Sequence, residues 1–170
     1  VDDLRDFARQ SPADLTETVD INEVLATAIR LVDNTIRSSS EHFKVSYGHQ
    51  LPLFRGNAQR IEQVIINLIV NACQSLESSE QSISIKTRYR PKENMLHLKI
   101  RDQGCGIEPD NLNRLSDPFF TTKREQGGTG LGLSVSASIV QEHGGSMFYE
   151  SALGKGTSVT LLLPVTPGAV

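Results

Sequence analysis

Two stretches in the middle of the chain alternate between apolar and polar residues, and Pro91-Lys92-Glu93-Asn94 separates them. Successive side chains of a β-strand point to opposite faces, so this period of two predicts strands over Ser82–Arg90 and Met95–Asp102, joined as a hairpin. In the second strand Leu96, Leu98 and Ile100 share one face, whereas His97, Lys99 and Arg101 share the other. The same phase puts Asp102 on the apolar face, where a carboxylate is costly unless it accepts hydrogen bonds.

Three other stretches repeat apolar residues with the period of an α-helix. They predict helices over residues 21–36, 58–76 and 131–142, each with one apolar face. Asp20 and Asn57 stand where the N-cap residues of the first two helices are expected. Short strands are predicted over residues 16–19, 43–47, 51–54, 147–150 and 157–163, the second and third of them around a turn at Gly48.

The composition excludes several classes of protein. The chain has 170 residues, enough for one domain with a proper core, and a formal net charge of -3. Its Lys and Arg residues are scattered rather than clustered, which argues against a nucleic-acid surface. No stretch is long and apolar enough to span a bilayer. Cys73 and Cys105 lack metal-ligand spacing, so a reduced, cytosolic setting is expected.

The four histidines suggest no chemistry of their own. His42, His49, His97 and His143 are interpreted as surface or capping residues, with His97 facing out of its strand and His143 ending a helix. None has a Cys or His partner at metal-ligand spacing.

A glycine-rich stretch leads into the third predicted helix: Gly127-Gly128-Thr129-Gly130-Leu131-Gly132-Leu133. A helix start presents free backbone N–H groups and the positive end of the helix dipole, which together suit a phosphate. A glycine cluster alone is equally compatible with a tight turn. Neither the dinucleotide-binding fingerprint nor the Walker A loop fits, because Leu133 stands where those motifs require Gly or Lys.

Polar side chains appear at unusual places in the predicted helices and strands. Asn67 and Asn71 lie four residues apart, on one stripe beside the apolar face of their helix. They are either solvated side chains at the border of the core or oxygen ligands for a hard cation such as Mg²⁺. Asp102 is either a turn-capping residue or a buried acceptor for an exocyclic amine, and Gly104 and Gly106 after it let backbone approach a flat ligand.

Four blocks occur in order along the chain. They are Asn67-x-x-x-Asn71-Ala72, Asp102-x-Gly104-x-Gly106-Ile107, Asp117-Pro118-Phe119-Phe120-Thr121-Thr122-Lys123 and Gly128-Thr129-Gly130-Leu131-Gly132-Leu133, followed by Gly154-x-Gly156-Thr157. Through these blocks the chain resembles the ATP-binding catalytic domain of sensor histidine kinases of two-component systems. That domain belongs to the ATPase superfamily shared with DNA gyrase and mismatch-repair ATPases, and the resemblance covers about Asp20 to Pro164.

The resemblance implies an α+β fold: a two-layer α/β sandwich of the Bergerat type. In it, a mixed, mostly antiparallel sheet of about five strands is covered on one face by three helices. The implied cofactors are ATP and Mg²⁺. Asn71 would ligate the metal through its amide oxygen, with Asn67 close by, and Asp102 would accept the adenine amino group, with the inward hydroxyl of Thr157 nearby.

The implied site is larger than these four residues. Residues 119–128 would form a short mobile lid, and Gly130 and Gly132 would place N–H groups beside the phosphates. Asn67, Asn71 and Lys123 are the implied catalytic residues. The implied nucleotide-binding set also contains Gln74, Asp102, Gly104, Gly106, Ile107, Phe120, Thr121, Thr122, Gly128, Thr129, Gly130, Leu131, Gly132, Leu133 and Thr157.

Two positions bear on which member of the superfamily this is. Gyrase-type ATPases have Glu where this chain has Asn67, which favours a kinase. Many histidine kinases have Lys where this chain has Gln74, which leaves Lys123, with Arg124, as the expected cationic contact to phosphate.

The resemblance also implies a function for the whole protein. The chain would bind Mg·ATP and transfer its γ-phosphoryl group to a histidine in an upstream helical dimerisation domain, for relay to a response-regulator aspartate. No histidine here has the acceptor context His-Glu-x-x-x-Pro. The alternatives are a non-catalytic nucleotide-binding or docking module and a switch-type protein serine kinase.

The expected organisation follows from that function. Residues 1–12 are predicted to be the tail of the upstream helix, residues 13–165 the catalytic domain and residues 166–170 a C-terminal tail. The expected partners are the chain's own dimerisation helices and a receiver domain, with no nucleic acid. The full-length protein is expected to be a cytoplasmic homodimer and this piece a monomer, with a membrane anchor left open.

Overall fold

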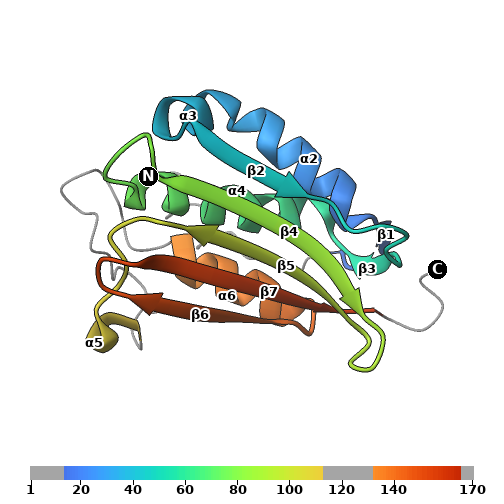
Figure 1. Ribbon diagram of the computed structural model, residues 1–170. Helices are drawn as coiled ribbons and strands as arrows, with labels where there is room; N and C mark the ends of the chain where they lie inside the picture. Colours follow the sequence, from blue (N-terminus) through green and yellow to red (C-terminus); the bar gives the residue numbers. More distant parts are fainter. Residues whose placement is uncertain (1–13, 113–131, 166–170) are drawn as a thin grey trace.

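The computed structural model describes residues 14–112 and 132–165 as a sheet with helices packed on one of its faces (Figure 1). The five strands lie in the order β2 (His42–Ser46), β4 (Ser82–Arg90), β5 (Met95–Asp102), β7 (Gly156–Pro164) and β6 (Ser146–Ala152). β2 runs parallel to β4, and all other neighbours are antiparallel. This mixed, mostly antiparallel sheet confirms the predicted fold class.

Three longer helices form the second layer. α2 (Ile21–Leu31), α4 (Ala58–Ser75) and α6 (Gly132–Glu142) lie behind the sheet in Figure 1, and the described residues place no helix on the opposite face. Two short helices, α3 (Asp33–Ser39) and α5 (Pro109–Leu112), lie at the margins. None of the described helices is long and apolar enough to cross a membrane.

α4 is the central helix of this layer, because it packs on α2, α6, β5 and β7. Its buried apolar side chains are Ile61, Val64, Ile65, Leu68, Ile69 and Ala72. They meet buried residues of the central strands, which include Leu98, Ile100 and Leu161. Each large aliphatic side chain buried in this way contributes about 1.5–3 kcal/mol, so this contact is the main source of stability. Asn57 caps α4 as predicted, since its side chain accepts the Arg60 N–H.

The single helix predicted over residues 21–36 is wrong, because the chain forms two helices. α2 ends at Leu31, and Val32 has φ -111° and ψ 18°, outside the helical range. Asp33 then begins α3 and pairs with Arg37 at 2.8 Å. Asp is a poor residue for a helix interior but a favourable one in a first turn, which matches the observed break.

The strands predicted around Gly48 do not pair with each other. β2 joins β4 in the main sheet, whereas the next strand, β3 (Phe54–Gly56), pairs with β1 (Glu17–Val19). Residues 51–53 are not strand, so the prediction of a strand over residues 51–54 holds only for Phe54. Phe54 is 1% exposed, and burial of this ring fixes where β3 lies. Local sequence pattern carries no such information about the partner of a strand.

The structure also gathers the cations that look scattered in the sequence. Alternate residues of three adjacent strands point to the uncovered face of the sheet, and these include Lys44, Lys86, Arg88, Arg90, Lys99 and Arg101, all of them exposed. The cations are thus scattered along the sequence but clustered in space. A strand with a basic residue at every second position carries no run of charge, yet all of its cations share one face.

His143 ends α6, as predicted, but its side chain is buried. This side chain is buried between α6 and the start of α4, where Nε2 accepts the Asn57 N–H at 3.0 Å and Nδ1 lies 2.8 Å from the Ile139 carbonyl oxygen. A Cβ on Gly56 would lie 2.5 Å from the imidazole ring, so that glycine makes room for it. His97 is also partly covered, with 12% side-chain exposure, and lies 3.2 Å from the Glu93 carboxylate.

Tyr149 on β6 provides a test of the packing between α6 and the sheet. Its hydroxyl is buried and forms no hydrogen bond within the described residues, and burial raises the pKa of Tyr149 to about 12. A raised pKa means that the folded state keeps the proton while the unfolded state ionises near pH 10. The free energy of unfolding is therefore unaffected below pH 10 and falls between about pH 10 and 12.

We predict that Tyr149→Phe removes this part of the pH dependence. The difference in unfolding free energy between wild type and Y149F should shift by about 1 kcal/mol between pH 8 and pH 11, with the wild type losing more. Urea denaturation followed by circular dichroism measures it. Tyr47→Phe is the matched control, because Tyr47 is exposed. Parallel pH curves for Y149F and wild type would contradict a buried, unpaired hydroxyl.

Candidate nucleotide site

Asp102 and Thr157 meet at one end of the sheet. They are paired directly in the register of β5 and β7, and their side chains are only 5% and 8% exposed. The Asp102 carboxylate accepts the Gly104 N–H at 2.9 Å. The sequence-based expectation that both side chains point inward is therefore confirmed. A buried carboxylate held by a backbone N–H is an acceptor group at the margin of the helical layer.

The glycines after Asp102 are required by close contact with neighbouring backbone. A Cβ on Gly104 would lie 2.3 Å from the Ser75 carbonyl oxygen, at the end of α4, which also accepts the Cys105 N–H at 3.0 Å. Gly106 has φ +76°, and a Cβ there would lie 2.1 Å from the Ala152 carbonyl oxygen. This segment is therefore held between the end of α4 and the end of β6, so its backbone is fixed in place.

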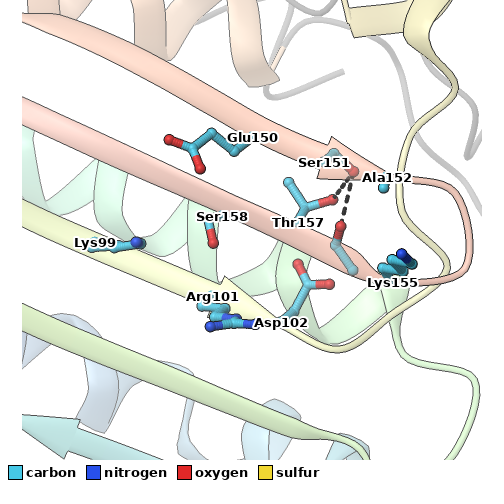
Figure 2. A pocket seen from close by; sticks show the side chains of 10 residues that line it. Lys99, Arg101, Asp102, Glu150, Ser151, Ala152, Lys155, Thr157 and Ser158 are labelled. Carbon is cyan, nitrogen blue, oxygen red and sulfur yellow. Dashed lines mark hydrogen bonds between the residues drawn. The ribbon is translucent and has the colours of Figure 1, made fainter.

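Ser151 is a site residue that the sequence did not single out. Its hydroxyl accepts the Ile107 N–H at 2.8 Å. It also donates to the Gly156 carbonyl oxygen at 2.9 Å and lies 2.8 Å from the Thr157 hydroxyl (Figure 2). One side chain thus joins the glycine segment to the start of β7 and orients Thr157. A serine in a short alternating strand gives no signal of this role, because its partners come from elsewhere in the chain.

Asn67 and Asn71 lie on α4, both partly buried, whereas Gln74 is exposed. The Asn67 amide nitrogen donates to the Ser136 hydroxyl at 3.2 Å and lies 3.4 Å from the Gly132 carbonyl oxygen. Ser136 is fully buried. With its nitrogen held by α6, Asn67 presents a fixed amide at the first residue of that helix. Ser136 is a second positioning residue that the sequence did not reveal.

The described residues bring together a coherent part of the predicted site. Asn71 lies one turn before Ser75, its carbonyl oxygen accepts the Ser75 hydroxyl at 2.9 Å, and Ser75 contacts the segment that follows Asp102. Asn67 links this region to Gly132 and Leu133 at the start of α6. The remaining predicted residues lie outside the described ranges: Phe119, Phe120, Thr121, Thr122, Lys123, Arg124, Gly128, Thr129, Gly130 and Leu131.

The described residues offer hydrogen-bonding groups rather than a metal cage. No group of three or more His, Cys, Asp or Glu side chains within residues 14–112 and 132–165 could hold a metal ion. At Gly132 an added Cβ would lie 3.9 Å from the Asn67 amide nitrogen, with no closer contact among the described residues. The backbone N–H groups of the first turn of α6 therefore lie beside Asn67.

The family of the chain is shown by comparison with known proteins. Residues 56–167 match the model of the histidine kinase-, DNA gyrase B-, and HSP90-like ATPase family, and the chain belongs to this family. Membership in a family of ATPases implies an ATP site, which fits the acceptor pair at Asp102 and Thr157.

Within this family, the chain is similar to sensor proteins and sensor histidine kinases. The chain is 41% identical over 162 residues to a sensor protein of Shewanella frigidimarina (strain NCIMB 400), covering 95% of this chain and 24% of the relative. It is 34% identical over 157 residues to the sensor histidine kinase ZraS of Escherichia coli (strain K12), covering 88% of this chain and 31% of ZraS. The chain thus spans about a quarter to a third of the length of these relatives.

Solved structures agree with the sequence relatives. The catalytic domain of histidine kinase ThkA, in a nucleotide-free form, has a TM-score of 0.77 at 27% identity, covering 91% of this chain and 98% of that domain. The mycobacterial sensor histidine kinase MprB has a TM-score of 0.74 at 26% identity, covering 88% of this chain and 97% of the solved chain. The fold is therefore that of a histidine kinase catalytic domain.

We predict that Ser151→Ala weakens nucleotide binding more than it weakens the fold. Loss of the hydroxyl removes the acceptor of the Ile107 N–H and the partner of Thr157, so affinity for ADP should fall about 5- to 10-fold, as for one lost hydrogen bond. Isothermal titration calorimetry measures the affinity. Ser158→Ala, one residue beyond Thr157 and on the uncovered face of the sheet, is the matched control. Equal ADP affinity for S151A and S158A would show that Ser151 does not order the site.

Proposed function

We propose that this chain binds Mg·ATP and supplies its γ-phosphoryl group to a histidine of a helical dimerisation domain, for relay to an aspartate of a response-regulator receiver domain. The observation that carries the proposal is the convergence of α4, the end of β5, the start of β7 and the start of α6 on one region. Asn71, Asp102, Thr157 and Gly132 come from these four elements. The names of the relatives support the kinase over the docking module and the serine kinase.

Adenine would bind at Asp102 and Thr157. An ionised carboxylate only accepts hydrogen bonds, which matches the exocyclic amino group of adenine as donor. The close packing of Gly104 and Gly106 on their neighbours keeps side chains away from the plane of the base. Because the single Ser151 hydroxyl proton goes to the Gly156 carbonyl oxygen, the Thr157 hydroxyl donates to Ser151 and would offer the base an acceptor.

The metal would be held mainly by the phosphates. Mg²⁺ keeps several waters and takes few protein ligands, usually one or two oxygens together with phosphate oxygens. The Asn71 amide oxygen suits this role, and Asn67 would stand beside it with its nitrogen held by Ser136. When bound, the metal would neutralise charge on the β- and γ-phosphates.

Positioning is then the main task of the chain. Phosphoryl transfer needs in-line geometry and charge neutralisation more than covalent help from the protein. The N–H groups at the start of α6, with the positive end of its dipole, would face the phosphates beside Asn67. Lys123 remains the proposed cationic contact. The nucleophile is the acceptor imidazole, which is largely neutral near pH 7 and needs little activation.

Two substitutions test the nucleotide site. Asn71→Ala should lower affinity for Mg·ADP at least tenfold and remove its dependence on Mg²⁺, because the metal loses its amide ligand.

Asp102→Asn places a donor against the adenine amino group, so affinity for Mg·ADP should fall about 30- to 100-fold. Asn34→Ala and Asp33→Asn on α3 are the matched controls. Calorimetry that finds unchanged affinity for N71A or D102N would remove that residue from the site.

The transfer step is tested in the full-length protein. Incubation with ATP labelled at its γ-phosphate should give an acid-labile, base-stable phosphoprotein, as expected for phosphohistidine, and N71A should give none. Acid-stable label would favour a serine kinase instead. Nucleotide binding with no label at all would favour the non-catalytic module.

A further inference from the structure

The uncovered face of the sheet carries a concentration of positive charge that the proposed kinase function does not use. We define the basic face as six exposed side chains on adjacent strands: Lys44 of β2, Lys86, Arg88 and Arg90 of β4, and Lys99 and Arg101 of β5. Glu150 of β6 is the single carboxylate among the outward strand positions. The chain as a whole has a net charge of -3, so this face is strongly polarised against the rest of the molecule.

The charges on the basic face are not balanced internally. Lys86 and Lys99 stand directly opposite each other in the register of β4 and β5. Like charges in directly opposed positions destabilise a sheet. Among the described residues, only Arg90 of the six forms an ion pair, with Glu93 of the hairpin turn at 3.7 Å. The fold therefore tolerates repulsion at the centre of this face, which an external anion would relieve.

A groove lies at one end of the basic face. Its volume is about 240 Å³, and its lining contains the cations Lys99, Arg101 and Lys155 and the carboxylates Asp102 and Glu150 (Figure 2). The lining also contains Ser151 and Thr157, so this end of the basic face borders the proposed adenine site. Three cations and two carboxylates make a mixed site, large enough for a carboxylate side chain but shallow. A uniform polyanion would meet Glu150 with repulsion, whereas a protein surface can place a donor there.

We propose that the basic face docks an acidic segment or surface of a partner protein, with one partner carboxylate entering the groove between Lys99 and Arg101. Neighbouring strands lie about 4.8 Å apart and alternate residues of one strand about 6.8 Å apart, so the cations form a grid that matches carboxylates at alternate positions of an extended segment. The interaction adds steering and orientation through charge complementarity.

The face suits other polyanions less well. Binding of single-stranded nucleic acid to a sheet uses aromatic side chains on which bases stack. Here the exposed aromatic residue on this face is Phe148, on the outermost strand β6 and 56% exposed. The outward positions of the central strands carry cations and small polar residues, together with the partly buried Met95, His97 and Leu162, which offer no exposed stacking platform. Anionic lipid headgroups would also meet the Glu150 carboxylate.

Paired charge reversals test the proposal. A fluorescein-labelled peptide that alternates Glu with Ser should bind the wild-type chain in fluorescence anisotropy, with an affinity that falls as salt rises. Lys86→Glu with Lys99→Glu should weaken this binding at least tenfold. Arg30→Glu with Arg55→Glu makes the same change in net charge at exposed sites outside the basic face, and should weaken binding less than twofold. No peptide binding, or equal losses in both variants, would overturn the proposal.

Two further measurements distinguish an acidic protein partner from nucleic acid and from membrane. A single-stranded oligonucleotide or phosphatidylserine vesicles that bind more tightly than the peptide, with the same dependence on Lys86 and Lys99, would overturn the proposal in favour of nucleic acid or membrane. K86E alone should raise the melting temperature by about 1–3 °C, because it puts opposite charges across the β4–β5 pair, while it weakens peptide binding. Lys99 lines the same groove as Asp102 and Thr157, so the Mg·ADP affinity of K86E/K99E is measured alongside. Unchanged Mg·ADP affinity assigns the loss of peptide binding to the basic face, whereas a parallel loss of Mg·ADP affinity would overturn that assignment.

Discussion

The packing of α4 against the centre of the sheet is the contact on which the rest of this structure depends. Its apolar stripe buries Ile61, Ile65 and Ile69 completely, and the same helix carries Asn67 and Asn71 along the edge of that stripe. Burial of the aliphatic side chains thus fixes the rotation of the helix about its own axis. That rotation in turn decides where the two amides lie. Stability and the placing of the two amides are thus set by one interface, and Ser136 of α6 then fixes the orientation of the Asn67 amide.

Backbone contact, rather than side-chain contact, builds the other half of the site. The segment after Asp102 passes so close to the ends of α4 and β6 that the neighbouring backbone leaves no room for a Cβ at position 104 or 106, where the chain has glycine. Ser151 then ties this segment to β7 through one hydroxyl. A flat ligand can approach the backbone at Gly104 and Gly106, because these residues carry no side chain. The result is an acceptor site with a rigid backbone.

The two faces of the sheet serve different purposes. The covered face supplies the core and ends in the proposed nucleotide site, while the uncovered face carries the basic face with unrelieved repulsion between Lys86 and Lys99. Retention of an unfavourable pair on an otherwise well-packed sheet is understandable if an acidic partner occupies it. Because the pleat sends alternate residues to opposite faces, β5 contributes Lys99 and Arg101 to the basic face and Asp102 to the proposed nucleotide site, and the two sets meet in one groove at the end of the sheet.

The sequence by itself determined the elements whose signal is local. The hairpin of β4 and β5, the cap of α4 at Asn57 and the inward phase of Asp102 all follow from period, turn chemistry and capping, which depend on near neighbours. Only the tertiary structure decided the partner of each strand, the break at Val32, the buried role of His143, the positioning contacts of Ser136 and Ser151, and the gathering of separate cations on one face. These features depend on residues far apart in the chain. A local sequence pattern does not show which distant surface will pack against a segment and bury it.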